Sequence, residues 1–359
     1  MSRVLVITGA SGLVGAELTA ALLPRFDRVL ALSRGAADLG ALRAAVRAAR
    51  PGGAEETRLL DRLDAMPVGE LSRGALAARG IDEIAQVWNV AAELSYDHAR
   101  LRETVAANTA APLRLLDLCR PTERFFQIST VGVTGPGRRG LRRVIREEAL
   151  WEVDAVNPYV VAKLMAEHLL DARGEATGHP VSSLRIGSVL GPAHRAPVRR
   201  NRAGYFTLAE MTARALRSGR PLSLDVDPAG TPPLLHVDDL AAACRELAER
   251  ARTGAEVHGY YHLGDQRLTN QAAAAAVNAE LGAEVLRIGE HRTALDRAHA
   301  AVNADNLAFM DCAFTFDRTV LESHLPPLAT PRVNAASYAG FLAREVRGAG
   351  AATAARRAA

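Results

Sequence analysis

The sequence predicts an α/β protein built on a doubly wound parallel sheet, with a smaller C-terminal appendage. Three observations lead to this prediction. In the first half of the chain, short apolar runs alternate with helical patterns, as in parallel sheets that are covered on both faces. The first apolar run leads directly into a glycine-rich turn. Beyond about Gly191 the alternation becomes irregular, and prolines and glycines interrupt the chain. Together these features are typical of a Rossmann-type fold.

The expected strands and helices alternate in order along the first 190 residues. Clusters of apolar and β-branched residues predict strands at residues 3–8, 28–33, 57–60, 86–91, 124–130 and 181–186. Helical periodicity predicts helices between them, at residues 15–23, 39–50, 101–119 and 159–172. We therefore assign residues 1–190 to the core of the fold.

The later part of the chain is expected to form the appendage, interleaved with the core. Helical patterns occur near residues 207–217, after Asp238 and after Thr269, and residues 260–263 have the pattern of a strand. We place the appendage at residues 191–347 and expect it to bind the substrate. The last residues, 348–359, are mostly Ala, Gly and Arg without a periodic apolar face, which predicts a frayed tail.

Composition excludes several protein classes. Hydrophobic residues make up 48% of the chain and charged residues 23%, which is ordinary for a globular protein and argues against disorder. No apolar stretch approaches the roughly 18 residues that span a bilayer, and no signal peptide precedes the first strand. We therefore expect a cytoplasmic protein with no membrane association. Cys119, Cys244 and Cys312 lack the spacing of metal ligands, so we expect reduced thiols and no metal.

The basic residues are unevenly distributed. A net charge of +4 does not by itself require nucleic acid, and no such partner is expected. Two segments are rich in arginine: Arg138, Arg139, Arg142, Arg143 and Arg146, and Arg195, Arg199, Arg200 and Arg202. Each is either a solvated loop or a landing site for an anionic substrate or partner. Lys163 is the only lysine among the 44 Lys and Arg residues. A lysine ammonium is a compact charge whose pKa the surroundings can shift, which suits a catalytic position.

A glycine-rich turn joins the first strand to the first helix. Gly9 permits the tight turn, Gly12 allows the backbone to approach a pyrophosphate, and Gly15 lets the helix pack on the sheet. The helix N-terminus offers free N–H groups and the positive end of its dipole to the phosphates. The turn therefore predicts dinucleotide binding by Gly9, Ser11, Gly12, Leu13, Val14 and Gly15.

The end of the second strand indicates which dinucleotide binds. NAD-selective sites place a carboxylate there, which bonds the ribose 2′-hydroxyl. Here the strand ends in Ser33 and Arg34, and no carboxylate follows before Asp38. Arg34 can fork onto a 2′-phosphate, and Ser33 can donate a hydrogen bond to it. We therefore expect NADP(H), the alternative being that Arg34 is an ordinary surface residue at a strand end.

Tyr159 and Lys163 form a candidate proton-transfer pair. They are four residues apart in a helical pattern and so share one helix face. A free phenol with a pKa of about 10 is a weak acid–base catalyst at neutral pH. An adjacent ammonium and the positive charge of a nicotinamide would stabilise the phenolate and lower that pKa. The pair predicts Tyr159 as the proton donor.

Further motifs accompany this pair in a consistent order. The expected strand at 124–130 ends in Thr130 and leads into VGVTG, and the chain also contains VWNVAA at 87–92, a helix with Asn108, LRIGSVLGP at 184–192 and HVDD at 236–239. With the glycine-rich turn and YVVAK at 159–163, these motifs resemble those of the extended short-chain dehydrogenases/reductases. The resemblance covers roughly residues 3–250.

This resemblance implies roles for individual residues. Thr130 would hold the substrate carbonyl, Tyr159 would donate the proton, and Lys163 would bind the cofactor ribose and tune Tyr159. The cofactor would also lie near Ala91, Ala92, Asn108, Gly187 and Val189. Asp61 is similar to the acidic residue after the third strand that contacts adenine in this family, with Asp64 as the alternative.

Within the family, Arg34 followed by a helix at 39–50, together with the segment 96–108, resembles the stand-alone thioester reductase-like branch. That branch implies an NADPH-dependent reductase of a small-molecule carbonyl or of an acyl thioester held on coenzyme A or a carrier protein. Val131 and Gly132 stand where sugar dehydratases of the family have acidic residues. A nucleotide-sugar epimerase with bound NAD(P) and a nonenzymatic NADP-binding protein remain as alternatives. The oligomeric state is left open.

Overall fold

The computed structural model describes residues 2–49, 58–136, 143–153, 156–197, 204–312 and 314–358. In this part of the chain, a seven-stranded sheet has the order β11–β7–β5–β4–β1–β2–β3. The strands are β1 (Val4–Thr8), β2 (Arg28–Ser33), β3 (Leu63–Pro67), β4 (Gln86–Asn89), β5 (Arg124–Thr130), β7 (Val181–Ile186) and β11 (Tyr260–Leu263). All neighbours pair in parallel. The predicted doubly wound parallel sheet is confirmed.

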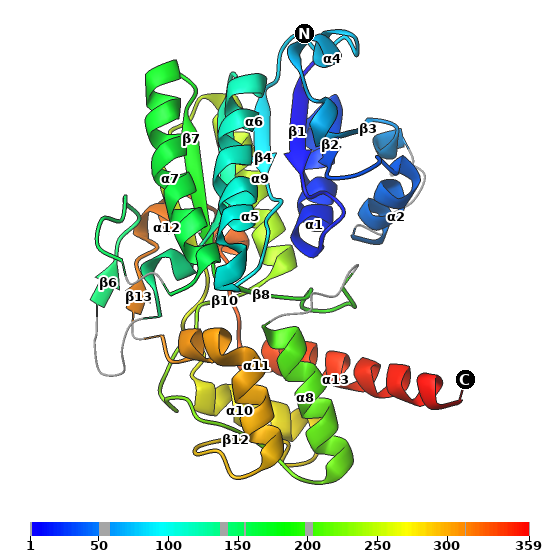
Figure 1. The fold of residues 1–359 in the computed structure, drawn as a ribbon, viewed down its shortest axis with the longest axis vertical. Helices are drawn as coiled ribbons and strands as arrows, with labels where there is room; N and C mark the ends of the chain where they lie inside the picture. The colour runs from blue at the N-terminus through cyan, green and yellow to red at the C-terminus, as the bar shows by residue number, and fades with distance from the viewer. Residues whose placement is uncertain are drawn as a thin grey trace.

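Helices cover both faces of this sheet (Figure 1). One face carries α1 (Leu13–Leu22), α2 (Leu39–Ala49) and α9 (Val237–Thr253), and the other carries α5 (Leu101–Val105), α6 (Ala111–Cys119) and α7 (Pro158–Thr177). In β1, Leu5 and Ile7 face the first set while Val4 and Val6 face the second. This two-sided burial explains why the strands read as continuous apolar runs. Within the described part of the chain, none of the helices combines the length and apolar composition that a bilayer crossing requires.

The prediction of the third strand was wrong. Residues 58–60 are helical, residue Thr57 lies outside the described part of the chain, and the strand is β3 instead. The short apolar run Leu59–Leu60 belongs to the end of that helix, and Leu60 packs into the core. In β3 only Leu63 and Met66 are buried, so the strand carries a weak apolar pattern. Position in the sheet, rather than local composition, decides this element.

The C-terminal tail also differs from the prediction. Helix α13 (Ala335–Ala358) continues through residues 348–358, where a frayed tail was expected. Alanine has the highest intrinsic helix propensity, so an Ala-rich segment can extend a helix without an apolar face to bury. The packed part of α13 supplies the preceding turns on which this extension builds, through residues such as Tyr338, Phe341 and Leu342.

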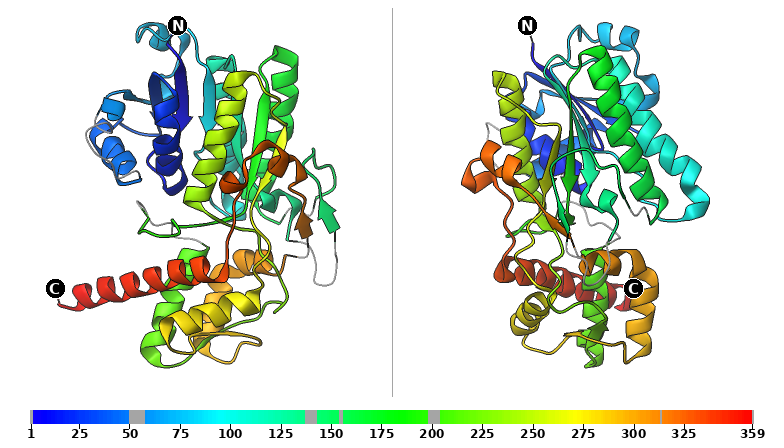
Figure 2. Two further views of the ribbon diagram at one scale, coloured as in Figure 1. Left: turned by 180° about the vertical axis from the view of Figure 1, so that it is seen from behind. Right: turned by 90° about the vertical axis from the view of Figure 1, so that its left-hand side faces the viewer.

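The appendage lies beyond the carboxyl ends of the core strands (Figures 1 and 2). It consists of α8 (Tyr205–Ser218), α10 (Asn270–Leu281), α11 (Ala294–Met310) and α13, with β9 (Leu222–Leu224) paired to β12 (Leu286–Ile288). These elements enclose their own apolar cluster. Between them the chain returns to the core through β10 (Leu234–His236), α9 and β11, so the appendage is interleaved with the core.

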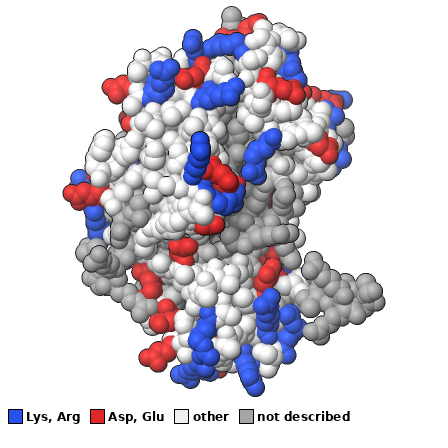
Figure 3. Space-filling view, in the orientation of Figure 1, with Lys and Arg blue, Asp and Glu red and all other residues white. Residues whose placement is uncertain are grey.

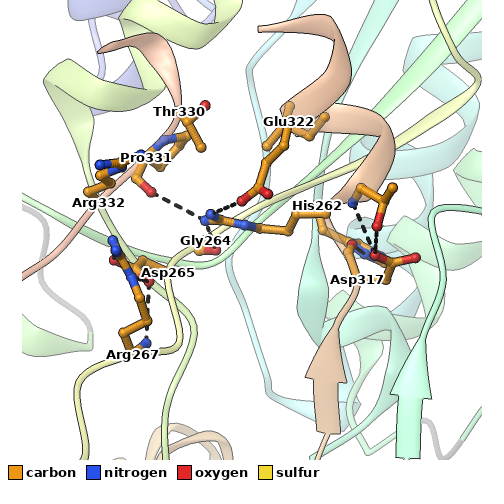
Figure 4. A network of polar contacts seen from close by, with 12 residues as sticks. His262, Gly264, Asp265, Arg267, Asp317, Glu322, Thr330, Pro331 and Arg332 are labelled. Carbon is orange, nitrogen blue, oxygen red and sulfur yellow. Dashed lines mark hydrogen bonds and ion pairs between the residues drawn. The ribbon is translucent and has the colours of Figure 1, made fainter. Parts of the chain in front are cut away.

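A polar network joins the two parts (Figure 4). The guanidinium of Arg318 donates hydrogen bonds to the carbonyl oxygens of Gly264 at 2.7 Å and Pro331 at 3.2 Å, and to Glu322 Oε1 at 2.6 Å. These partners follow β11, precede α13 and lie in α12 (Thr319–His324), respectively. Asp265 accepts a further bond from the backbone N–H of Val333 at 2.7 Å. The chain is therefore held where it leaves the core for α13.

A buried ion pair lies beneath the carboxyl end of β5. Arg185 of β7 and Glu167 of α7 are 0% and 1% exposed, and Arg185 Nη2 lies 2.7 Å from Glu167 Oε2. Ser129 of β5 donates its hydroxyl hydrogen to Glu167 Oε1. Removing one partner of a buried pair leaves the other charge uncompensated, which costs far more than losing an exposed pair.

We predict that Glu167→Ala lowers the free energy of unfolding by about 3–5 kcal/mol, because it strands the Arg185 guanidinium. Asp117→Ala is the matched control, since the Arg173–Asp117 pair has the same 2.7 Å separation but side chains that are 48% and 45% exposed. That variant should lose about 1 kcal/mol or less. Urea unfolding measures both values, and equal losses would contradict the prediction.

Candidate functional site

The turn after β1 has no room for side chains. Gly9 has a φ of +69°, and a Cβ there would lie 2.8 Å from the backbone nitrogen of Ala91. A Cβ on Gly15 would lie 1.9 Å from the carbonyl oxygen of Gly9. Both glycines are therefore required by close approaches, one between the turn and the segment after β4 and one within the turn itself.

The N-terminus of α1 fits a bound pyrophosphate. Gly12 is the N-cap residue and no side chain caps the helix. None of the described residues accepts a hydrogen bond from the backbone N–H groups of Leu13, Val14 or Gly15. Gly12, Leu13 and Val14 are half-buried and Ser11 is exposed. These donors and the positive end of the helix dipole suit the phosphates of a dinucleotide.

The segment that begins at Ala91 is fixed from two sides. Thr8 Oγ1 accepts hydrogen bonds from the backbone N–H groups of Val90 and Ala91, each at 3.0 Å. Asn108 exchanges two bonds of 2.8 Å with the backbone of Glu93. Asn108 therefore positions this segment through both ends of its buried amide, and its predicted contact with the cofactor stays a prediction. Ala91 and Ala92 remain half-buried at the predicted place.

A carboxylate lies near the end of β2 after all. Ser33 donates its hydroxyl hydrogen to the carbonyl oxygen of Gly35. The Arg34 side chain is 80% exposed, and its Nη1 lies 3.6 Å from Glu93 Oε2. Glu93 also lies 3.3 Å from Arg100 Nη1. The expectation that no carboxylate is close to Arg34 holds for the local sequence and is wrong in space, because the loop after β4 brings in Glu93.

The prediction for Asp61 was wrong. Asp61 precedes β3 and therefore lies at the amino end of that strand, whereas the glycine-rich turn lies at the carboxyl edge of the sheet. Its exposed carboxylate lies 3.8 Å from Arg43. The alternative, Asp64, lies inside β3 and pairs with Arg28 at 2.7 Å. Neither carboxylate follows the third strand, which was the basis of the prediction.

Thr130, Tyr159 and Lys163 converge at the carboxyl end of β5. Lys163 Nζ donates a 2.7 Å hydrogen bond to the carbonyl oxygen of Ile128, two residues before Thr130. The same ammonium lies 5.9 Å from the centroid of the Tyr159 ring, which occupies the first turn of α7. Thr130 Oγ1 accepts a bond from the Gly132 N–H at 3.0 Å, so its own hydrogen is free to reach a substrate oxygen.

The sequence of α7 explains this placement. Asn157 caps the helix by accepting a hydrogen bond from the Val160 N–H, and Pro158 follows at the first helical position. The helix therefore starts immediately before Tyr159. One turn later Lys163 lies on the same face, against β5.

Burial dominates the electrostatics of the candidate site. Burial raises the pKa of the Tyr159 phenol above its ordinary value, and the nearby Tyr96 raises it further. Burial lowers the pKa of Lys163 to about 8, while Glu167 acts in the opposite direction. The residues of the chain alone do not bring Tyr159 towards neutrality. A lowered phenol pKa would need the positive charge of a bound nicotinamide.

The remaining predicted cofactor residues lie where the core meets the appendage. Gly187 follows β7, and a Cβ there would lie 2.4 Å from the carbonyl oxygen of Pro233, so only glycine fits. Val189 lies half-buried in β8 (Ser188–Leu190), which pairs with β10. Both positions follow the strand next to β5.

The sequence analysis missed side chains that close the site from elsewhere in the chain. Tyr96, in the loop after β4, has its ring centroid 6.0 Å from that of Tyr159. Phe309 of α11 reaches the turn after Thr130, where a Cβ on Gly132 would lie 3.2 Å from its Cζ. Burial raises the pKa of Tyr96, and Asp305, also in α11, raises it further. No local pattern marks the α11 residues, because only tertiary packing brings this helix to the site.

The arginine-rich segments are only partly described. Arg138, Arg139, Arg142, Arg199, Arg200 and Arg202 lie outside the described residues. Arg143 lies 3.8 Å from Glu152, and Arg195 pairs with Glu17 of α1. On the face shown in Figure 3, acidic and basic side chains are interspersed. The described arginines are therefore partly neutralised by carboxylates.

Comparisons with known proteins agree with this fold. Residues 5–264 match the model of the NAD dependent epimerase/dehydratase family. Among solved structures, the terminal R domain from the myxalamid PKS-NRPS biosynthetic pathway is 22% identical, with 97% of this chain and 91% of that chain covered and a TM-score of 0.74. A UDP-glucuronic acid 4-epimerase from Bacillus cereus in complex with NAD is 17% identical, with 96% and 97% covered and a TM-score of 0.65. A thiolation-reductase di-domain from an archaeal non-ribosomal peptide synthetase is 15% identical, with 97% and 76% covered and a TM-score of 0.69.

We predict that the acylation rate of Lys163 rises with pH around a midpoint of about 8, because burial lowers its pKa to about 8. Bound NADH or NADPH should slow this labelling further, because the dinucleotide would restrict the reagent's access to the already buried ammonium. Since Lys163 is the only lysine, mass spectrometry can follow its peptide, with the N-terminal amine as internal control. Equal labelling rates with and without dinucleotide would place Lys163 outside the cofactor site.

Proposed function

Because the chain belongs to the NAD dependent epimerase/dehydratase family of extended short-chain NAD(P)-dependent oxidoreductases, we propose that it is an NADPH-dependent reductase of a carbonyl or acyl-thioester substrate. The observation that carries the proposal is the convergence of Thr130, Tyr159 and Lys163 at the carboxyl end of β5. A hydroxyl donor, a phenol and a buried ammonium at one strand end form a proton-transfer site beside the dinucleotide turn. The intact trio argues against a nonenzymatic dinucleotide-binding protein.

The chain's own residues would divide the chemistry as follows. The hydride for the carbonyl carbon would come from NADPH held at the glycine-rich turn. Thr130 donates its free hydroxyl hydrogen to the carbonyl oxygen, which orients and polarises the substrate. Tyr159 donates its phenolic proton to the same oxygen as negative charge develops there. Lys163 holds the ribose of the cofactor and stabilises the phenolate that remains.

A ketone or aldehyde gains one hydride and one proton and becomes an alcohol. An acyl thioester gains the same pair and forms a hemithioacetal, whose carbon–sulfur bond then breaks to release an aldehyde and a thiol. We include thioesters held on coenzyme A or on a carrier protein in the proposal. Their pantetheine phosphate is an anion that arginine binds well, although Arg143 and Arg195 already have carboxylate neighbours.

Cofactor choice separates the reductase from the epimerase. An epimerase oxidises and re-reduces its sugar with a retained cofactor, whereas a net reductase must exchange its cofactor after every turnover. Arg34 is exposed at the carboxyl end of β2 and can bind a 2′-phosphate. The phosphate would replace Glu93 as the partner of Arg34. This position supports NADPH and therefore net reduction. Reductase domains and epimerases both share the fold of this chain, so similarity of fold does not choose between them.

We predict net NADPH oxidation with acyl thioesters, aldehydes or ketones, measured by loss of absorbance of the reduced nicotinamide. Tyr159→Phe should lower kcat by about 10²–10⁴-fold, because it removes the proton donor while retaining the ring. Its affinity for NADPH, measured by calorimetry, should stay near that of the wild type. Turnover of a UDP-sugar without net NADPH consumption would instead establish the epimerase. Wild-type kcat in Tyr159→Phe would refute the proposed proton donor.

We predict that Arg34→Asp shifts the NADPH-to-NADH preference by about tenfold or more towards NADH. The substitution removes a charge-assisted hydrogen bond to the 2′-phosphate worth about 1.5–3 kcal/mol and adds a repelling charge. Arg217→Asp is the control, because Arg217 is exposed near the end of α8 in the appendage. Calorimetric titration with both cofactors measures the shift. Tighter binding of NADH than of NADPH by the wild type would overturn the NADPH assignment.

A further inference from the structure

A row of polar side chains crosses the centre of the sheet. Thr8 of β1 lies in register with Asn89 of β4, and Asn89 lies in register with Gln127 of β5. All three side chains are buried. On the same face, the neighbouring positions of these strands are the apolar residues of the core cluster that includes Val6, Val87 and Phe125. We call Thr8, Asn89 and Gln127 the polar ladder.

The polar ladder is a continuous chain of hydrogen bonds. Thr8 Oγ1 donates to Asn89 Oδ1 at 2.8 Å, and Asn89 Nδ2 donates to Gln127 Oε1 at 2.8 Å. Gln127 Nε2 then donates to the carbonyl oxygen of Ile128 at 3.0 Å. Each bond sets the orientation of the next amide, so the ladder has one consistent direction from β1 to β5.

Both ends of the ladder reach the proposed active site. At one end, Thr8 Oγ1 accepts the backbone N–H groups of Val90 and Ala91, which begin the segment expected to contact the cofactor. At the other end, the Ile128 oxygen that accepts from Gln127 also accepts from Lys163 Nζ at 2.7 Å. The two nitrogen atoms on that oxygen are therefore at most about 6 Å apart, within the range where charge strongly affects a pKa.

Packing alone does not explain the ladder. Buried polar side chains cost free energy unless every group is bonded, and apolar residues of similar size would fill this face without that requirement. The last amide of the ladder finds its acceptor in a backbone carbonyl that it shares with Lys163. The free-energy cost of burying these polar side chains therefore depends on where the Lys163 ammonium lies.

We propose that Gln127 is a positioning residue for Lys163, and that the polar ladder links the ammonium to the cofactor segment at Ala91. Gln127 and Lys163 donate to the same Ile128 oxygen, so the Gln127 bond restricts where the ammonium can bind that oxygen, on the α7 face that carries Tyr159. The functional consequence rests on the proposed function, because it requires Lys163 to act in proton transfer. The effect of Gln127 on the position of the ammonium does not rest on the proposed function.

The charges around Lys163 make this testable. On its own helix the ammonium faces Tyr159 and Glu167, and from β7 Arg185 neutralises Glu167. Tyr96 lies beyond Tyr159. The polar ladder contributes no charge. A carboxylate in place of the Gln127 amide would therefore add a new anion beside the ammonium and remove the donor to Ile128.

The test compares Gln127→Glu and Asn89→Asp by pH-dependent acylation of Lys163. Gln127→Glu should raise the labelling midpoint by about one to three pH units, because the new carboxylate lies close to the ammonium. Asn89→Asp places the charge one strand farther away and should shift the midpoint in the same direction by less. Thr109→Val is the matched control. It removes a buried 2.7 Å hydrogen bond from Thr109 Oγ1 to the carbonyl oxygen of Ala162 in α7, the helix that carries Lys163. It should leave the midpoint unchanged.

Gln127→Met tests positioning without a new charge. It should lower kcat by about tenfold to a hundredfold with a smaller change in substrate KM, because a displaced ammonium affects the chemical step. Unchanged labelling midpoints in both acidic variants would overturn the proposal, even if Gln127→Met fails to fold. If the labelling midpoint shifts but Gln127→Glu, Asn89→Asp and Gln127→Met all keep the wild-type kcat, Gln127 positions the ammonium. The catalytic role of Lys163 is then refuted. Midpoint and kcat changes together support both.

Discussion

The parallel pairing of β1 with β4 is the constraint on which the rest of the structure depends. This pairing places Thr8 beside Asn89 and makes the chain leave both strands at the same edge of the sheet. The loops then run so close together that a Cβ on Gly9 would lie 2.8 Å from the backbone of Ala91. Because β4 is also paired with β5, Thr130 emerges at that edge as well. The glycine-rich turn and the candidate catalytic residues are thus neighbours for one geometric reason.

Polar and charged groups are buried beneath the candidate catalytic residues. Lys163, Glu167 and Arg185 are buried side chains that a sheet protein would ordinarily keep in water. Glu167 and Arg185 compensate each other, whereas Lys163 has the Ile128 carbonyl as its hydrogen-bond acceptor. Burial without a directly bonded carboxylate is what lowers the pKa of Lys163 to about 8. Burial therefore tunes this ammonium, rather than a single strong ion pair.

The appendage completes the site from the side opposite the core. Its helix α11 brings Phe309 to the turn after Thr130, and Asp305 acts on Tyr96, which stands beside Tyr159. The helix contains a non-helical residue at Asn303, so its two halves point in different directions. Arg318 ties the end of β11 to the segment that enters α13 and so fixes the appendage against the core. Substrate selection would then depend on residues far from the dinucleotide motifs.

Local sequence was sufficient wherever a short-range requirement imposes the residue type. The tight turn requires Gly9, the helix start requires Asn157 and Pro158, and helical periodicity alone puts Tyr159 and Lys163 on one face. Two-sided burial likewise makes most core strands visible as apolar runs. These features predicted the fold and the central pair of the candidate site.

Other features were decided only by tertiary structure, because they depend on which distant segments meet. The strand at Leu63–Pro67 became visible only through its pairing with β2, and this pairing placed Asp61 at the wrong end of the sheet for a cofactor contact. Glu93 reached Arg34 through a loop from another strand. The amide of Asn108 forms hydrogen bonds with the backbone of that same loop. Hydrogen bonds and charges act through space, so a chain read in one dimension shows which groups are present but not which of them become partners.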